Sequence, residues 1–176
     1  MTASPHFPAS KTAVGSHPAR KTIPALLPAA RNVAASGFEL VFLTPPHERI
    51  DAIKRGVPAE HVGVLAERMH IPKESLIATL RLSRATINRK ARDKKPLSQD
   101  ESERVLGVEY LIGQVENMVR ESGVPQGFDA AIWVSAWLHT PLPALGNKLP
   151  ASYMDTVEGQ KLVSNILAMG QSGAYA

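Results

Sequence analysis

The chain has 176 residues, of which 44% are hydrophobic and none is cysteine. This length supports one domain with its own hydrophobic core, and the lack of cysteine excludes a disulfide framework, a thiolate metal site and thiol catalysis. The formal net charge is +4, and no apolar run approaches the roughly 20 residues that a membrane-spanning helix needs. Because no apolar signal segment follows the N-terminus either, we expect a soluble protein of the cytoplasm with no membrane partner.

The positive charge is concentrated in two places. Residues 1–38 contain four basic residues and no acidic one, which accounts for the whole net charge. Residues 81–95 contain seven basic residues and one acidic residue, a local charge of +6, whereas residues 99–129 contain seven acidic residues and two arginines. This distribution predicts one cationic face and one anionic face.

The first segment, residues 1–37, is rich in Pro, Ser and Ala and shows no sustained periodicity, so we expect a flexible, disordered N-terminal tail. An acid-free start that contains arginine is also typical of an organellar transit peptide, but the repeated prolines would break the amphipathic helix of such a peptide. The next segment, FELVFLT at 38–44, is predicted to be a strand or an extended lead-in.

From residue 45 onward the pattern is helical. A short helix is expected to end at Gly56, a second to open with Pro58 at its first position, and a third to begin after Pro72.

The longest predicted helix begins at Ser98, which has capping-box spacing with Glu101, and it closes at Gly123. Its apolar side chains recur at intervals of three and four: Val105, Val108, Leu111, Ile112, Val115, Met118 and Val119. This is the longest helix that the sequence predicts.

The C-terminal part is predicted to contain two more helices. The first, near residues 127–140, stops at Pro141, and a loop follows to residue 150. The second opens with Asp155 and Glu158 as another capping box and closes at Gly170. The whole pattern predicts an all-α fold.

The basic stretch follows the helix of residues 73–80 after a tight turn at 81–83, which is the layout of a helix-turn-helix with Ser83 as the cap of its second helix. The first residues of that second helix would face base edges in the major groove. Arginine can pair with guanine, asparagine with adenine, and a threonine methyl can contact thymine. The residues expected there are Arg84, Ala85, Thr86 and Asn88. The other basic side chains are expected to neutralise phosphates: Arg81, Arg89, Lys90, Arg92, Lys94 and Lys95.

Two alternatives compete with this interpretation. The basic stretch could be an ordinary solvated helix face, which is common for charged segments. A helix-turn-helix could also lie one element earlier, in residues 61–80, with His70-Ile71-Pro72 as its turn. The later position is favoured because the second helix of the earlier one carries apolar residues where base-reading groups are needed.

No catalytic residue, metal site or cofactor is expected. The acids at 100, 101 and 103 have no histidine at ligand spacing, and Glu101 already has a capping role. Asp129, Ser135 and His139 lack the nucleophile elbow and the glycine-rich loop of a hydrolase. His61 and His70, nine positions apart, do not share a helix face well enough to bind a metal.

Two tryptophans, Trp133 and Trp137, lie one helical turn apart. Such a pair is most often part of the core, and we expect that for at least one of them. Because aromatic residues are preferred anchors in protein interfaces, the other could lie at a subunit contact.

The C-terminal sequence contains a series of short motifs in order: Trp137-Leu138, Pro141, Ala144-Leu145-Gly146, Pro150, Asp155-Thr156, Glu158-Gly159, Val163, Leu167 and Gly173-Ala174-Tyr175-Ala176. This pattern resembles the C-terminal toxin-binding domain of the Xre/MbcA/ParS family of bacterial antitoxins. Upstream, LSRATINRK resembles the recognition helix of that family, and LSQDES with Arg104 resembles the start of its next helix. Two positions depart from the pattern: Asn147 replaces a second glycine, which asparagine tolerates because it enters the left-handed region readily, and Ala85 replaces a basic or polar residue.

The flexible tail at 1–37 lies outside the resemblance, which implies two domains after it: a helix-turn-helix DNA-binding domain at 38–122 and a toxin-binding domain at 123–176. It implies an antitoxin that neutralises a RES-domain toxin, which consumes NAD, by covering its active site, and that binds its own double-stranded promoter DNA to regulate its own transcription. The protein would then be bacterial and cytoplasmic, and associated with the nucleoid when bound to DNA. The residues expected at the toxin are Trp137, Asp155, Glu158, Lys161, Asn165, Gly173, Tyr175 and Ala176.

A second function stays open at this point, a helix-turn-helix transcriptional regulator without a toxin partner. A homodimer is expected in either case, because one small helix-turn-helix contacts too few phosphates for tight, specific binding.

Overall fold

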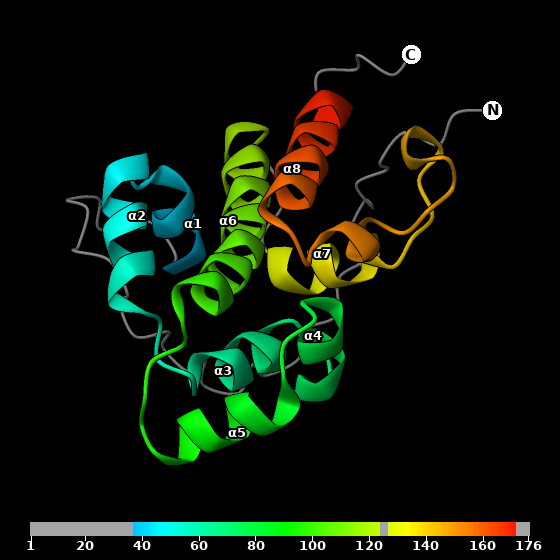
Figure 1. Ribbon diagram of the computed structural model, residues 1–176. Helices are drawn as coiled ribbons and strands as arrows, with labels where there is room; N and C mark the ends of the chain where they lie inside the picture. The colour runs from blue at the N-terminus through cyan, green and yellow to red at the C-terminus, as the bar shows by residue number, and fades with distance from the viewer. Residues whose placement is uncertain (1–36, 124–126, 172–176) are drawn as a thin grey trace.

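The computed structural model describes residues 37–123 and 127–171 (Figure 1). Residues 1–36 of the predicted tail at 1–37, together with Gly173, Tyr175 and Ala176, lie outside the described residues, and Gly37 is the first residue of a helix. Within them the chain is all-α, as predicted, and contains eight α-helices and two short 3-10 helices. The helices are α1 (Gly37–Leu43), α2 (Pro46–Arg55), α3 (His61–Arg68), α4 (Lys73–Thr79), α5 (Arg84–Arg92), α6 (Gln99–Glu121), α7 (Ala130–Leu138) and α8 (Val157–Gln171), with η1 (Pro143–Leu145) and η2 (Pro150–Tyr153) between the last two.

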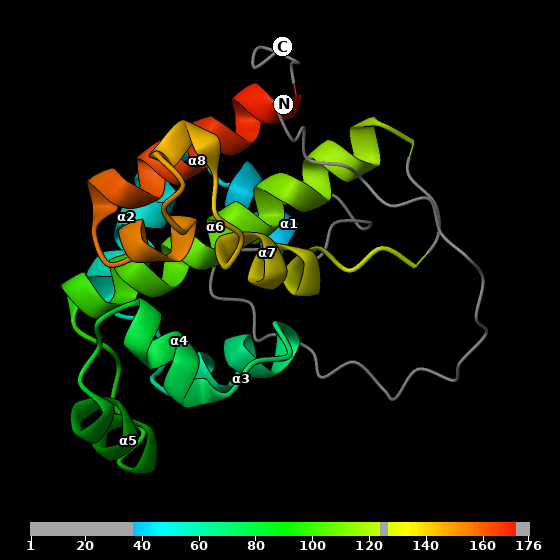
Figure 2. The same ribbon diagram turned by 90° about the vertical axis from the view of Figure 1, so that its right-hand side faces the viewer.

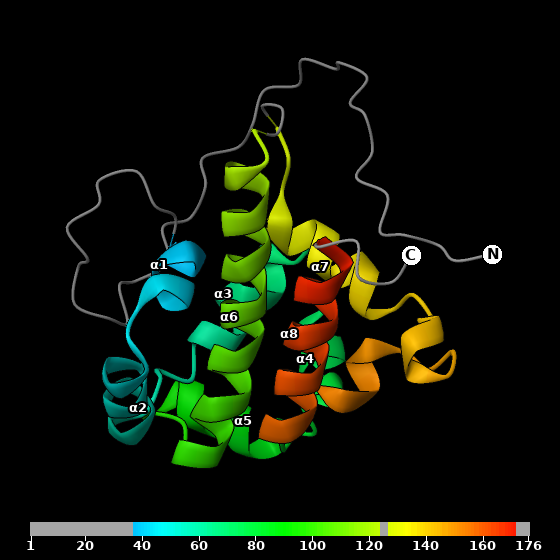
Figure 3. The ribbon, with the colours of Figure 1, turned by 90° about the horizontal axis from the view of Figure 1, so that it is seen from above.

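Helix α6 is the central element of the fold. Figures 1 and 3 both place α1 and α2 on one side of it and α8 on the other, and each of these helices contacts α6, as does α7. Figures 1 and 2 place α3, α4 and α5 together at one end of the molecule, with α5 outermost. The predicted helix-turn-helix therefore forms one end of the protein.

The predicted apolar face of α6 is confirmed. Six of its seven predicted side chains are buried, and the seventh, Val119, is partly buried against them. The same core continues from Phe38 in α1 to Leu167 in α8. The boundary predicted at 122–123 coincides with the end of α6, but the segments on either side of it share one hydrophobic core.

The prediction of a strand at 38–44 is wrong, because this segment forms α1. Phe38 and Val41, three positions apart, are buried in the core, which is a helical spacing. A short apolar run does not distinguish a strand from one buried turn of helix. Packing against α6 favours the helix, and the ion pair between Glu39 and Arg120 of α6 (2.9 Å) stabilises this packing further.

The start of α6 is formed as predicted. Ser98 Oγ accepts a hydrogen bond from the Glu101 N–H (3.3 Å), and the Glu101 carboxylate accepts one from the Ser98 N–H (2.7 Å). The second predicted capping box is wrong. Thr156 Oγ1 accepts from the Gly159 N–H (3.1 Å), while Asp155 forms an ion pair with Arg81.

Two other predicted helix ends differ in detail. The helix expected to open at Pro58 begins at His61, after a turn in which the Pro58 carbonyl accepts from the His61 N–H (3.0 Å). Helix α8 ends at Gln171, one residue past Gly170. Asn147, by contrast, has the expected left-handed backbone, with φ 61°.

Candidate functional site

Helix α5 presents the basic stretch to solvent. Ile87 is fully buried and anchors the helix on the core, while Ser83, Arg84, Ala85, Asn88, Arg89 and Arg92 are exposed. Thr86 is half-buried. One buried anchor with exposed residues at spacings of three and four gives an amphipathic helix whose outer face is cationic. This is the surface that a major-groove helix needs.

The beginning of α5 is fixed by its cap. Ser83 Oγ accepts a hydrogen bond from the Thr86 N–H (3.3 Å), as predicted. The turn before it depends on Arg81, which adopts a left-handed backbone conformation with φ 46°. The Leu82 N–H then donates to the Ile77 carbonyl (2.9 Å), which closes the end of α4. The helix-turn-helix is therefore held by local hydrogen bonds on both sides of its turn.

Two side chains at the start of α4 contact the outer face of α5. Lys73 Nζ donates a hydrogen bond to Asn88 Oδ1 (2.9 Å), and Glu74 Oε1 lies 3.5 Å from a guanidinium nitrogen of Arg84. Lys73 and Glu74 were not among the site residues predicted from the sequence. Their position at the first turn of the first helix of a helix-turn-helix is the signal that could have identified them.

Lys90 differs from the other basic residues of the stretch. Its Nζ lies 2.5 Å from Glu101 Oε2, and its side chain is only 19% exposed. Burial alone would raise the pKa of the Glu101 carboxyl, but the Lys90 ammonium and the hydrogen bonds from Ser98 outweigh it and hold the pKa below its ordinary value. Lys90 therefore ties α5 to the start of α6.

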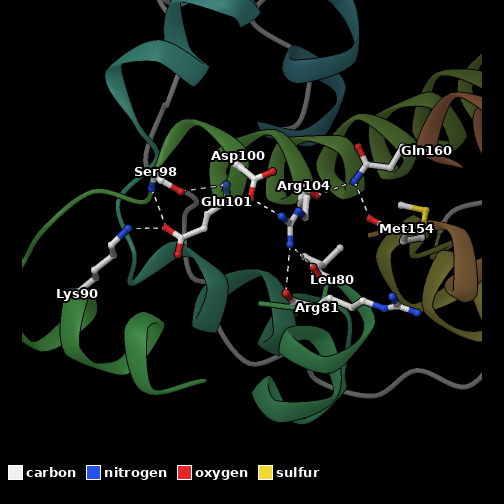
Figure 4. A network of polar contacts seen from close by, with 9 residues as sticks. All are labelled: Leu80, Arg81, Lys90, Ser98, Asp100, Glu101, Arg104, Met154 and Gln160. Atoms are coloured by element: carbon white, nitrogen blue, oxygen red, sulfur yellow. Dashed lines mark hydrogen bonds and ion pairs between the residues drawn. The ribbon is translucent and has the colours of Figure 1, made fainter. Parts of the chain in front are cut away.

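Arg104 of α6 stabilises the turn between α4 and α5 (Figure 4). One guanidinium nitrogen donates to the carbonyls of Leu80 (3.0 Å) and Arg81 (3.1 Å), and another pairs with Asp100. These carbonyls belong to the C-terminus of α4, where a cation also suits the helix dipole. The sequence analysis placed Arg104 only in the opening of a helix, because its partners in the turn are distant in sequence.

The same network continues into the C-terminal part. Gln160 of α8 donates from Nε2 to the carbonyls of Arg104 (3.0 Å) and Met154 (2.9 Å). Arg81 Nε lies 3.1 Å from Asp155 Oδ2, with the arginine side chain 77% exposed and the aspartate 16% exposed. The structure thus brings together Arg81, expected at DNA, and Asp155, expected at the toxin.

Helix α8 has one face in the core and one in solvent. Val163, Ile166 and Leu167 are buried, whereas the outer face combines exposed apolar and polar side chains. That outer face contains Val157, Glu158, Lys161, Leu162, Asn165 and Met169. A mixed apolar and polar face of this kind is suited to a protein partner.

The tryptophans lie on α7, which packs against α6. The Trp133 and Trp137 rings are stacked, with centroids 5.9 Å apart and planes 13° apart, and both residues are half-buried against the core. Trp137 is thus partly accessible, and its stacking on Trp133 restricts the orientation of its ring.

The residues considered for catalysis have structural roles. Asp129 caps α7 by accepting from the Ala131 and Ile132 N–H groups (3.0 and 3.2 Å), and His139 lies at the opposite end of that helix. His61 Nε2 and Glu109 Oε1 form a buried hydrogen bond between α3 and α6. Among the described residues no cluster of three His, Asp or Glu is arranged to hold a metal, and none of the helices in this part of the chain is long and apolar enough to cross a membrane.

Comparison with known proteins agrees with this geometry. A family profile described as the antitoxin Xre-like helix-turn-helix domain matches residues 48–108, and one described as the antitoxin Xre/MbcA/ParS C-terminal toxin-binding domain matches residues 128–173. The Prs ADP-ribosylating antitoxin of Sphingobium sp. (strain YBL2) is 45% identical over 139 residues, which are 79% of this chain and 87% of that relative. The first match includes α4, the turn and α5, and the second includes α7 and α8. The chain therefore belongs to the Xre/MbcA/ParS family of antitoxins, with a helix-turn-helix DNA-binding domain followed by a toxin-binding domain.

Proposed function

We propose that this antitoxin neutralises a RES-domain toxin that consumes NAD, and that it represses its own promoter through α5. The single observation that carries the proposal is the presence of two chemically different exposed faces on one core, a cationic one on α5 and a mixed one on α8. The name of the Sphingobium relative refers to ADP-ribosylation, a transfer that takes its ADP-ribose group from NAD. A toxin with NAD chemistry is therefore the partner that fits best.

On the DNA side, Arg84, Thr86 and Asn88 are the proposed base contacts, with Ala85 as a small neighbour. The proposed phosphate contacts are Arg81, Ser83, Arg89, Arg92, Lys94 and Lys95. Lys90 is left out of this set, because its ammonium is already paired with Glu101 and largely covered. Each phosphate contact releases counterions, so operator binding is expected to weaken steeply with salt.

On the toxin side, the proposed contacts are the outer face of α8, with Glu158, Lys161 and Asn165, and the exposed edge of Trp137. Asp155 lies at the margin of this face and is paired with Arg81. Gly173, Tyr175 and Ala176 lie outside the described residues. We propose that this chain end follows α8 into the toxin and covers its active site.

The test uses two double variants of the full chain. Arg84→Ala with Arg89→Ala is expected to weaken binding to a duplex of its own promoter by at least about tenfold and to lower the salt slope by about 1, while toxin neutralisation is retained. Lys161→Glu with Asn165→Arg is expected to weaken toxin neutralisation while promoter binding is retained. DNA binding is measured by fluorescence anisotropy, and neutralisation by the NAD consumption of the toxin encoded beside the antitoxin gene.

The matched control is Lys54→Ala with Arg55→Ala, which removes two exposed basic residues from α2. It should leave both activities near the wild-type level. Loss of both activities in the α5 variant would contradict separate surfaces. Failure of the wild-type chain to bind the neighbouring toxin would leave the stand-alone regulator as the function.

We also propose that the DNA-bound form is a homodimer, since two recognition helices reading a palindrome would lie about 34 Å apart, one turn of DNA. Analytical ultracentrifugation of the chain with its operator duplex checks this. A single antitoxin copy per duplex at saturation would contradict it.

A further inference from the structure

The outer face of α5 does not meet DNA alone, because the first two residues of α4 reach across to it. Lys73 Nζ donates to Asn88 Oδ1 at 2.9 Å, and Glu74 lies 3.5 Å from Arg84. Arg84 and Asn88 are, together with Thr86, the polar side chains of α5 that are proposed to read bases. Arg84 and Asn88 are thus each held by a side chain from the preceding helix.

The contact with Lys73 changes what Asn88 can recognise. A lysine ammonium only donates hydrogen bonds, so the amide of Asn88 must turn its oxygen toward Lys73 and its NH2 group away. An unrestrained asparagine recognises adenine because it accepts from N6 and donates to N7 together. Oδ1 keeps a second lone pair, but the Lys73 ammonium beside it repels the N6 amino donor of adenine, so the donors of the NH2 group are what Asn88 offers a base most readily.

The surroundings reinforce this donor character. The Lys73 ammonium has two further N–H groups, and Arg84 has several, because its pairing with Glu74 uses only one nitrogen. Of the four bases, guanine presents two acceptors, O6 and N7, side by side in the major groove. A group of donors from Lys73, Asn88 and Arg84 matches that edge and not the mixed edge of adenine.

We propose that Lys73 is a specificity-determining residue, and that the Lys73–Asn88 pair directs this antitoxin to guanine in place of the adenine that asparagine alone would select. This rests on the proposed DNA-binding role of α5. Lys73 acts on specificity by fixing the orientation of the Asn88 amide.

The experiment selects binding sites for the full chain from randomised DNA duplexes and sequences them. The base read by Asn88 is the position at which Asn88→Ala loses its preference. At that position the wild type is expected to prefer guanine over adenine by about tenfold. Lys73→Met keeps the length of the side chain but removes the donor, so the amide is free to rotate and the preference is expected to shift to adenine.

The matched control is Lys95→Met, which removes an exposed positive charge from the same end of the molecule. It should weaken binding to all sequences alike and leave the base preference unchanged. The inference is overturned if the wild type selects adenine at this position, or if Lys73→Met behaves as Lys95→Met does. In both outcomes specific DNA binding persists, so the proposed function survives. Enrichment of no sequence at all would instead contradict the DNA-binding role itself and the inference with it.

Discussion

Gly113 lies on α6 where the backbone of α1 packs against it. A Cβ atom at Gly113 would stand 2.1 Å from the Phe38 carbonyl oxygen and 2.9 Å from Phe42 Cβ. Backbone cannot yield at that distance without displacing α1 and its buried Phe38. We expect Gly113→Ala to destabilise the protein by about 1–3 kcal/mol, despite the better helix propensity of alanine.

Urea denaturation followed by circular dichroism measures this effect as a lower midpoint with an unchanged slope. Gly63 of α3 is the matched control, because a Cβ there would meet only Lys73 Cδ, at 4.0 Å. Gly63→Ala should be stabilising by about 0.5–1 kcal/mol. Equal effects of the two substitutions would show that α1 does not pack against Gly113.

Single residues of the candidate site could be predicted from sequence where their partners are local. The Ser83 cap and the outward direction of Arg84 and Asn88 follow from the helix pattern around Ile87. The contacts Lys73–Asn88 and Arg81–Asp155 could not be predicted in this way, because each joins two helices or helix ends whose relative placement only the tertiary packing determines.

Among the elements, the start of α6 combines a capping box with an ion pair to α5. Glu101 accepts from the Ser98 N–H and from Lys90, and these contacts hold the pKa of its carboxyl below the ordinary value of about 4.3. A carboxyl whose pKa is lower in the folded state than in the unfolded state stabilises the fold above the unfolded pKa. This stabilisation is lost as the pH falls through the folded pKa.

We therefore expect the difference in unfolding free energy between the wild type and Glu101→Gln to be largest near neutral pH and to diminish below about pH 4. Chemical denaturation at a series of pH values measures it. In a Lys90→Met background the same difference should be smaller at neutral pH. Ser98→Ala, which removes the other half of the box, should cost about 1 kcal/mol at neutral pH. If this difference in unfolding free energy grew as the pH fell, the lowered pKa of Glu101 would be contradicted.

At the same scale, the elements with strong caps and long periodic faces were predictable, and those without them were not. Helix α6 has both signals, so its start and its buried face followed from sequence. Helix α1 is a short apolar run whose form depends on α6. At the start of α8, Asp155 and Thr156 could each have served as the cap, and the ion pair with Arg81 directs Asp155 elsewhere.

For the whole molecule, the important contact is the ion pair between the turn of the helix-turn-helix and the start of α8. Arg81 Nε and Asp155 Oδ2 lie 3.1 Å apart. Arg104 and Gln160 link the same two segments through backbone carbonyls (Figure 4). The proposed DNA surface and the proposed toxin surface are thus adjacent at one point. A substitution on either side of this contact is therefore expected to alter binding at the other surface.

Asp155→Asn tests this coupling. The substitution removes a negative charge beside a proposed phosphate contact and releases the Arg81 guanidinium, so DNA binding is expected to become tighter and its salt slope steeper by about 1. The matched control is Asp51→Asn on α2, which makes the same change in net charge at an exposed position away from α5. Anisotropy titrations of both variants over a range of salt concentrations measure the slopes. If the two variants gain affinity for DNA equally, the change in net charge alone explains the gain. If only Asp155→Asn gains affinity, and the gain disappears when Arg81 is also replaced by Met, the ion pair restrains DNA binding in the free antitoxin.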